Sequence, residues 1–523
     1  MPLTKWWDRA RDLPGAPRVR GVGVTAEEWI QCAGDVAASG GRLLAMWASG
    51  CEDPDSDATF EVEDICTATP DPPSARDASS HGAEVYAAFL TDRGVLVIEL
   101  PVRGTHATAK SRFEYPGIEA LFSCASRMQR AMFDVSRVRS SDPDRRPWLR
   151  HPAHGPELVR VSGEGVHEIA VGPVHAGTIE PGHFRFSVVG EKVLRLEERL
   201  GYTHKGVERR FTELPLLEGQ RLAARIAGDS AVAYSWAYCQ ALEGMAECVI
   251  PPRAAALRGL FLELERIANH LGDVGALAND AGFAFGLTQF SRIKEELLRA
   301  ISHAFGQRYL LDAVVPGGTQ VDASAKAVKS LATRIVAMGR ESTELRAIYE
   351  DHAGVRDRFT GAGILTPDLA LRLGVLGLVG RASGQALDAR VDFAVPPYDK
   401  LPPAKVLRQE GDVGARVAMR FDELAESCRL AEALLTSLPP GAHLAPIQVP
   451  ADGSFATGFI EGWRGPVFIA LEAGPGGRIQ RCHPHDPSWQ NWPAIEYAIL
   501  GNIVADFPLI NKSFNLAYSG VDL

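Results

Sequence analysis

The stretch DFPLINKSFNLAYSGVDL, residues 506–523, carries apolar side chains at close intervals along an otherwise polar segment. The apolar and aromatic residues are Phe507, Leu509, Ile510, Phe514, Leu516 and Tyr518. A solvated terminal segment would leave this surface in water, at a cost of roughly 25 cal/mol per Å². We therefore expect the stretch to be threaded into the interior. We also expect it to close a site together with RIAGDS, residues 225–230, which lies far away in the sequence.

The composition is that of an ordinary globular protein. The chain has 523 residues, of which 46% are hydrophobic and 23% are charged, so it is long enough for two or more domains with substantial cores. A formal net charge of -10 argues against nucleic acid as the main partner, because there is no basic surplus to neutralise phosphates. The densest basic run, residues 139–150, is interpreted as a solvated linker.

No stretch of the sequence is apolar over the roughly 20 residues that a membrane-spanning helix needs. The first residues also lack the apolar core of a signal peptide. We therefore expect a cytoplasmic chain that reaches a membrane only through partners.

The cysteines are scattered without CxxC pairing, so we expect reduced and mostly buried thiols rather than an iron–sulfur site. They are Cys32, Cys51, Cys66, Cys124, Cys239, Cys248, Cys428 and Cys482. Cys482 lies next to His483 and near His485. We interpret these three residues as part of a strand and not as metal ligands.

The sequence pattern predicts an N-terminal domain followed by a linker. Residues 1–140 contain an expected helix at 26–39, an apolar strand at 41–49 and a hairpin that turns at 92–94, which together predict a small α/β domain. Residues 141–160 are dense in proline, arginine and histidine and are expected to be a linker.

The remaining part of the chain, residues 161–523, is expected to form a larger and mainly helical domain with small β-sheets. Its clearest helix is PPRAAALRGLFLELERIANHLGDVG, residues 251–275, which begins with proline and carries an apolar stripe at helical spacing. Glu263, Glu265, Arg266 and His270 lie off this stripe. The pattern therefore predicts an amphipathic helix.

Several short motifs follow one another in a fixed order along residues 166–523. They are EPGHF at 180–184, THKGVE at 203–208, PPRA with LELERIANHL at 251–271, PGG at 316–318, RASG at 381–384 and RGP with GRIQR and DPSWQNWPA at 464–494. In this order they resemble the large subunit of membrane-bound, energy-converting nickel–iron hydrogenases and its homologue, the 49-kDa subunit of respiratory complex I. Residues 1–140 more weakly resemble the 30-kDa complex I subunit. The resemblance implies an α+β fold, with a hydrogenase-large-subunit-like domain after the small α/β domain.

In those hydrogenases two CxxC pairs hold the nickel–iron centre, and the resemblance places the four cysteines at Ala227, Ser230, Ala517 and Gly520 of this sequence. Nickel in this centre needs soft thiolate ligands. Alanine and glycine offer no side-chain donor, and a serine hydroxyl is a hard and weak ligand. We therefore expect no nickel–iron centre and no other cofactor in this chain. Metal-containing relatives also carry a cleaved C-terminal extension, whereas three residues follow Gly520 here.

The resemblance to complex I is also incomplete. A tyrosine that binds the quinone headgroup in complex I corresponds to Gly228, and the histidine-containing loop of that family has no clear counterpart in HAGTIEPG, residues 175–182. The usual pair of quinone-binding residues is thus expected to be absent.

Two carboxylates are candidates for proton transfer. Glu180 resembles the proton-transfer glutamate of the family, and Asp280 falls where complex I has an aspartate near the quinone cavity. An unpaired buried carboxylate would have a raised pKa, which a proton relay needs. We expect the two to border a wet cavity at the lost metal site. The alternatives are a solvated loop acid for Glu180 and an ordinary turn aspartate for Asp280.

Three functions are compatible with these residues. The first is the large subunit of a membrane-associated, complex I-like and hydrogenase-4-like oxidoreductase complex that couples electron transfer to ion translocation. The second is a non-catalytic coupling subunit with a vestigial site, and the third is a quinone-reducing subunit with a remodelled pocket. The resemblance implies a small partner subunit with an iron–sulfur cluster, antiporter-like membrane subunits, and a place on the cytoplasmic face of the inner membrane.

Overall fold

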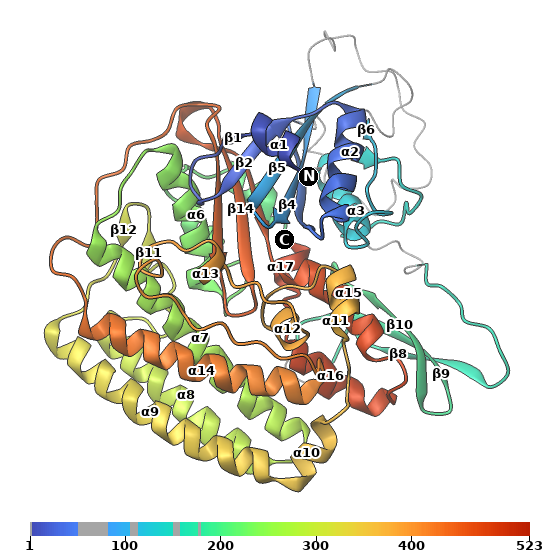
Figure 1. Cartoon of the computed structure of the whole chain (residues 1–523), viewed down its shortest axis with the longest axis vertical. Helices are drawn as coiled ribbons and strands as arrows, with labels where there is room; N and C mark the ends of the chain where they lie inside the picture. The colour runs from blue at the N-terminus through green and yellow to red at the C-terminus, as the bar shows by residue number, and fades with distance from the viewer. Residues whose placement is uncertain (1–2, 51–81, 105–112, 150–156, 176–178) are drawn as a thin grey trace. The chain divides into compact units, whose positions relative to one another are not determined.

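A computed structural model describes residues 3–50, 82–104, 113–149, 157–175 and 179–523 of the chain. Its contacts group the chain into two compact units, whose elements are labelled in Figure 1. The first unit is Met1–Asp12, Arg20–Val159 and Arg199–Gly201, and the second is Leu13–Val19, Arg160–Glu198 and Tyr202–Leu523. The predicted thiols Cys51 and Cys66, residues 150–156 of the predicted linker and residues 176–178 of the predicted loop lie outside the described residues.

The first unit is built on a five-stranded sheet with the order β1-β2-β5-β4-β3. Its elements are α1 (Thr4–Arg9), β1 (Arg11–Asp12), β2 (Val19–Gly23), α2 (Ala26–Ala38), β3 (Arg42–Ser49), β4 (Gly82–Thr91), β5 (Gly94–Arg103), β6 (Phe113–Tyr115), α3 (Ala125–Ser136) and β7 (Val138–Ser140). Helix α2 begins at a capping box, in which the Thr25 hydroxyl accepts from Glu28 N and the Glu28 carboxylate accepts from Thr25 N. The predicted helix, strand and hairpin of this region are confirmed.

The basic run at residues 139–150 is packed as far as Leu149, where a solvated linker was expected. The backbone N–H groups of Trp148 and Leu149 donate to Asp134 Oδ2 at 2.7 and 2.8 Å. Both side chains are buried. Buried apolar surface and satisfied backbone donors together fix this segment.

The second unit combines many helices with two three-stranded sheets, β10-β9-β8 and β13-β14-β15, and the small pair β11-β12. Its strands are β8 (Val166–Val171), β9 (His183–Val189), β10 (Lys192–Arg199), β11 (Val314–Val315), β12 (Gly318–Thr319), β13 (Phe455–Glu461), β14 (Pro466–Ala473) and β15 (Ile479–His485). Its helices are α4 (Val207–Thr212), α5 (Gly219–Ala223), α6 (Ala231–Met245), α7 (Pro252–Asp280), α8 (Ala284–Phe305), α9 (Ala325–Asp351), α10 (Ala353–Phe359), α11 (Pro367–Arg372), α12 (Gly377–Ala382), α13 (Ala389–Asp392), α14 (Val413–Thr436), α15 (Ser488–Ala498), α16 (Phe507–Phe514) and α17 (Ser519–Asp522), with the short 3₁₀ turns η2 (Pro475–Gly477) and η3 (Val504–Asp506). The predicted fold class, α+β with a mainly helical second part, is confirmed.

Helices α7, α8, α9 and α14 lie side by side as a bundle (Figure 1). Helix α7 also contacts α6, α16 and β12, so it is covered on every side and is not amphipathic. Glu263, Arg266 and His270 are each 0% exposed. A buried charge needs a partner. Glu263 accepts from Arg390 on α13 and from Tyr398 in the loop after it, and His270 is hydrogen-bonded to Glu423 on α14. Arg266 donates to the backbone oxygens of Glu461 and Gly462.

Among the described residues, none of the helices is both long enough and apolar enough to span a bilayer. Six cysteines lie in the described part of the chain, and all of them are free thiols. Five of the six are buried, as the sequence predicts.

Candidate functional site

The C-terminal stretch is buried, as the sequence predicts. Its six apolar and aromatic residues are each at most 5% exposed. Arg464, in the turn after β13, links this stretch to residues 225–230. Its Nη1 donates to Asp229 Oδ1 at 2.7 Å and its Nε donates to the backbone oxygen of Asn515 at 2.5 Å. Asn515 Nδ2 in turn donates to Asp273 Oδ1 on α7. One arginine side chain therefore brings together two segments that are far apart in the sequence.

Asp486, immediately after β15, makes a second connection between the same segments. Its Oδ2 accepts from the Tyr234 hydroxyl on α6 at 2.7 Å, and its Oδ1 accepts from Ser488 N at 2.8 Å. A Cβ built on Gly520 would lie 2.7 Å from Oδ2 of the same carboxylate. The Asp486 carboxylate thus occupies the space into which a side chain at position 520 would extend.

The four positions assigned to metal ligands are all buried and all engaged by neighbours. Ser230 Oγ is hydrogen-bonded to Asp229 and accepts from Arg464 Nη1 at 3.3 Å. Ala517 N donates to Ser488 Oγ at 3.0 Å. Its backbone oxygen accepts from the indole nitrogen of Trp492. Ala227 is 4% exposed.

These surroundings do not fit a nickel–iron centre. The side chains at the four positions supply one hydroxyl oxygen and no sulfur, whereas the centre requires soft thiolates. The guanidinium of Arg464 and the carboxylate of Asp486 take up the adjacent space. Within the described ranges, no three His, Cys, Asp or Glu side chains are grouped so that they could hold a metal ion.

Glu180 and Asp280 lie at different places around this site. Glu180 is an exposed residue of the loop before β9, and its Oε2 accepts from Tyr518 N at 3.3 Å, beside Ala517. Asp280 ends α7 and is ion-paired, with 2.9 Å between its Oδ1 and Lys512 Nζ on α16. Asp280 is therefore paired with a lysine, where an unpaired carboxylate was expected.

A cavity of about 270 Å³ lies beside the Asp229–Arg464 pair, and neither Glu180 nor Asp280 lines it. This differs from the predicted wet cavity bordered by both carboxylates, because both residues are engaged elsewhere. The cavity is lined by Gly228, Asp229, Leu264, Glu265, Ala268, Asn269, Lys294, Leu298, Ile301, Arg308, Tyr309 and Leu310.

Two carboxylates in the wall of this cavity have shifted pKa values of opposite sign. Burial raises the pKa of Glu265 to about 8, although its carboxylate accepts from Val232 N and Ala233 N at the start of α6. Burial would also raise the pKa of Asp229, but the charge of Arg464 and the hydrogen bonds from Arg464 and Ser230 together outweigh burial and lower that pKa. At neutral pH the cavity therefore has one neutral carboxyl group and one ion-paired carboxylate in its wall.

Arg464, Asp486 and Glu265 were not predicted as site residues from the sequence. Arg464 and Asp486 belong to the RGP and DPS motifs, so a signal existed, but no pattern in the sequence says that they contact residues 229 and 234. For Glu265, the sequence pattern shows only that the residue lies off the apolar stripe of α7. Only the tertiary contacts show that these three residues belong to the site.

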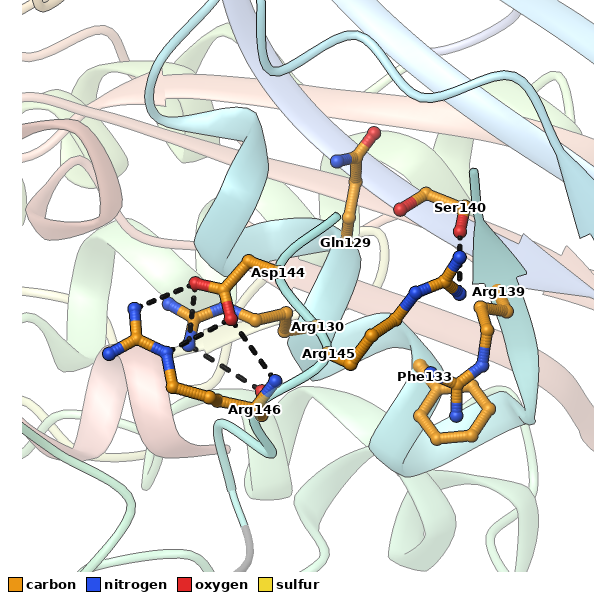
Figure 2. Close-up of a pocket in the computed structure, with 8 residues that line it drawn as sticks. All are labelled: Gln129, Arg130, Phe133, Arg139, Ser140, Asp144, Arg145 and Arg146. Atoms are coloured by element: carbon orange, nitrogen blue, oxygen red, sulfur yellow. Dashed lines mark hydrogen bonds and ion pairs between the residues drawn. The ribbon is translucent and has the colours of Figure 1, made fainter. Parts of the chain in front are cut away.

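A second hollow lies in the first unit and has a volume of about 10 Å³, room for about one water molecule. Figure 2 shows that arginines of the basic run surround it and that Asp144 lies between Arg130 and Arg146. Arg146 Nη2 donates to Asp144 Oδ2 at 2.8 Å. The Arg139 guanidinium lies 3.6 Å from the centre of the Phe133 ring. These arginines are used for packing and pairing within the unit.

The sequence of this chain is similar to those of known proteins, and the matches agree with one another. Residues 280–450 match the sequence profile of the family described as respiratory-chain NADH dehydrogenase, 49 Kd subunit. The chain is 30% identical over 388 residues to formate hydrogenlyase subunit 5 of Escherichia coli (strain K12), with 74% of this chain and 68% of that protein covered. It is 29% identical over 352 residues to the carbon monoxide-induced hydrogenase of Rhodospirillum rubrum, with 67% of this chain and 97% of that protein covered.

A solved structure shares the fold. The structure of the membrane-bound sulfane sulfur reductase, an archaeal respiratory membrane complex, contains a chain that matches with a TM-score of 0.65 and 22% sequence identity. The match covers 69% of this chain and 99% of that chain. At this level of identity the likeness establishes the fold of the matched part.

Proposed function

The chain belongs to the family that includes formate hydrogenlyase subunit 5 and the 49-kDa subunit of respiratory NADH dehydrogenase, and from this premise we propose that it is the large subunit of a membrane-associated oxidoreductase complex that has no nickel–iron centre. The complex resembles complex I and hydrogenase-4, and it couples electron transfer to ion translocation. Support comes from relatives that are named as hydrogenase subunits on one side and NADH-quinone oxidoreductase subunits on the other.

The observation that carries the negative part of this proposal is the contact between Gly520 and Asp486. A cysteine at position 520 would need the space that the Asp486 carboxylate fills. Missing donors alone would leave an empty metal site. The filled space beside Gly520 supports the proposal further, because Tyr234 and Ser488 hold the Asp486 carboxylate in place there.

The proposed partners follow from the family. They are a small subunit that carries an iron–sulfur cluster and antiporter-like subunits in the membrane. The chain itself would be peripheral, on the cytoplasmic face of the inner membrane. The respiratory membrane complex that shares its fold supports this setting.

The experiment is to purify the complex from detergent-solubilised membranes through an affinity tag on this chain. Co-purifying subunits are identified by mass spectrometry, and nickel and iron are measured per chain. We expect iron from a partner's clusters, donor-dependent reduction of an acceptor, and no stoichiometric nickel. Stoichiometric nickel or hydrogen uptake would contradict the proposal. Iron–sulfur signals without any turnover would instead favour a non-catalytic coupling subunit.

A further inference from the structure

The cavity beside Asp229 is formed by three separate parts of the second unit. One wall is the loop before α6, which contributes Gly228 and Asp229, and the second is α7 with Leu264 and Glu265. The third wall is α8 together with the loop that follows it. A volume of about 270 Å³ is at the lower end of the range for small-molecule sites. An apolar cavity of roughly 150 Å³ already accommodates benzene. The space therefore suits a compact organic molecule.

Most of the wall is apolar, and part of it is bare backbone. Leucine, isoleucine and alanine side chains of α7 and α8 face the cavity, together with the half-exposed ring of Tyr309. A Cβ built on Gly228 would meet no atom within 4 Å. Leu310 holds a positive φ of 55°, which is uncommon for a residue other than glycine. Such backbone conformations are concentrated at ligand sites.

The charged groups of the cavity leave an excess of positive charge. Lys294 lines it and, among the described residues, forms no hydrogen bond or ion pair. Arg308 also lines it and shares the single carboxylate of Glu295 with Arg299. The negative charge of Asp229 is paired with Arg464. This local excess contrasts with the formal net charge of -10 on the whole chain.

Glu265 adds a neutral hydrogen-bonding group at neutral pH. The charged groups that act on it are Asp229 in the loop before α6 and Arg266 on its own helix, and Lys294 and Arg308 also line the cavity. Its environment favours the protonated form, because burial outweighs the hydrogen bonds from the start of α6. A protonated carboxyl does not repel an anion and can donate one hydrogen bond.

We propose that this cavity binds a small organic carboxylate whose apolar body is about the size of a benzene ring. The carboxylate would pair with Lys294, and the ring would lie against the leucine and isoleucine side chains in the space left open at Gly228. The inference does not depend on the proposed membrane complex, since it uses only the residues of this cavity.

The test is isothermal titration calorimetry of the full chain, or of the purified complex, with benzoate. Benzamide has the same ring without the charge, and octanoate distinguishes a ring-sized site from one for an alkyl chain. We expect benzoate to bind at least about tenfold more tightly than benzamide, because a hydrogen bond to a charged group is lost with the charge. Equal binding of benzamide, or of a neutral benzoquinone, would overturn the assignment.

Two variants and one control test the named contacts. Lys294→Gln should weaken benzoate binding about tenfold, as expected for losing a charged partner. Gly228→Leu should abolish it, because the new side chain starts in open space and extends into the cavity that Gly228 lines. Lys326→Gln removes an exposed lysine of α9 and should change nothing. Circular dichroism checks the folding of each variant. Unchanged binding in both Lys294→Gln and Gly228→Leu would show that benzoate lies elsewhere.

A pH series tests the role of Glu265. As the pH rises through about 8, Glu265 loses its proton and adds a negative charge to the wall. Benzoate affinity should therefore fall in the native protein and stay level in Glu265→Gln. An equal fall in both proteins would exclude Glu265 as the titrating group. No binding of any probe at either pH would refute the site as a whole.

Discussion

At the scale of single residues, glycines of the two segments that meet at this site differ in the space around them. The Asp486 carboxylate lies where a side chain at Gly520 would begin. Gly228, in the other segment, also has no side chain, but its Cβ position is open. The two glycines thus look alike in the sequence and have opposite surroundings in the fold.

Substitution by alanine should separate these two glycines. Gly520→Ala places a methyl group 2.7 Å from Asp486 Oδ2, and overpacking of this kind costs about 1–3 kcal/mol. Gly228→Ala is the matched control and should change the free energy of unfolding by less than about 0.5 kcal/mol. Urea denaturation followed by tryptophan fluorescence measures both. Equal stability of the two variants would mean that the carboxylate moves aside freely.

Glu180 and Asp280 make specific contacts at this scale, one with Tyr518 N and the other with Lys512. We predict that Glu180→Gln and Asp280→Asn each impair ion coupling, because each removes a charge next to the C-terminal stretch, while assembly is retained. Proton or sodium uptake by vesicles containing the complex measures coupling. Glu164→Gln, at an exposed loop position, is the control. Coupling at the native level in both variants would leave these carboxylates as structural residues.

At the scale of elements, a buried carboxylate joins α4 to β15. Glu208 on α4 accepts from Arg481 Nη2 at 2.9 Å and contacts His483 Nδ1 at 2.5 Å. Burial alone would raise the pKa of Glu208, but the charges of Arg481 and His483 outweigh it and lower the pKa to about 2. The two elements are therefore held together by an ionised group.

This contact predicts acid sensitivity. The unfolded chain takes up a proton at Glu208 near its ordinary pKa of about 4.3, whereas the folded chain does so only near 2. The stabilisation is thus complete above about pH 4.3 and is lost as the pH falls towards 2, a change of about 3 kcal/mol. Glu208→Gln should be less stable than the native chain at pH 6, and the difference should shrink at pH 3.

Denaturation at several pH values measures that difference. Glu213→Gln, an exposed acid just after α4, is the matched control and should follow the native curve. A difference between Glu208→Gln and the native chain that stays constant with pH would show that Glu208 does not titrate in this range.

At the scale of the whole molecule, residues that are hundreds of positions apart share one set of contacts in the second unit. Arg464 binds both Asp229 and Asn515, and Asn515 binds Asp273 on α7. The C-terminal stretch therefore lies among residues of α6, α7 and the turn after β13. The C-terminal stretch should therefore stay packed only while the turn after β13 holds it.

Hydrogen exchange should show this dependence. Arg464→Ala leaves Asp229 partly buried without its counter-charge and frees Asn515 O, so we expect amide exchange to rise at least about tenfold in residues 513–523 and at the start of α6. The first-unit sheet should exchange at its native rate. Arg429→Ala, which removes an exposed pair on α14, is the control and should leave both regions unchanged. Exchange that rises only at Asp229 would show that the two segments open independently.

Much of the fold was predictable because it depends on local patterns. The helix at residues 251–275 and the hairpin near residue 93 follow from apolar periodicity and turn residues. The burial of the C-terminal stretch followed from its apolar content. The burial of Glu263, Arg266 and His270 on α7 was not predictable, since periodicity does not show which other elements bring partners to buried charges.

The sequence by itself determined the family, the main elements and the chemistry missing at Ala227, Ser230, Ala517 and Gly520, because side-chain donors are read directly from residue types. Only the tertiary structure decided what surrounds these four positions. The carboxylate beside Gly520, the salt bridge of Asp229 with Arg464 and the position of the cavity all come from segments distant in the chain. Contacts of that kind depend on how the elements pack, and no local pattern encodes them.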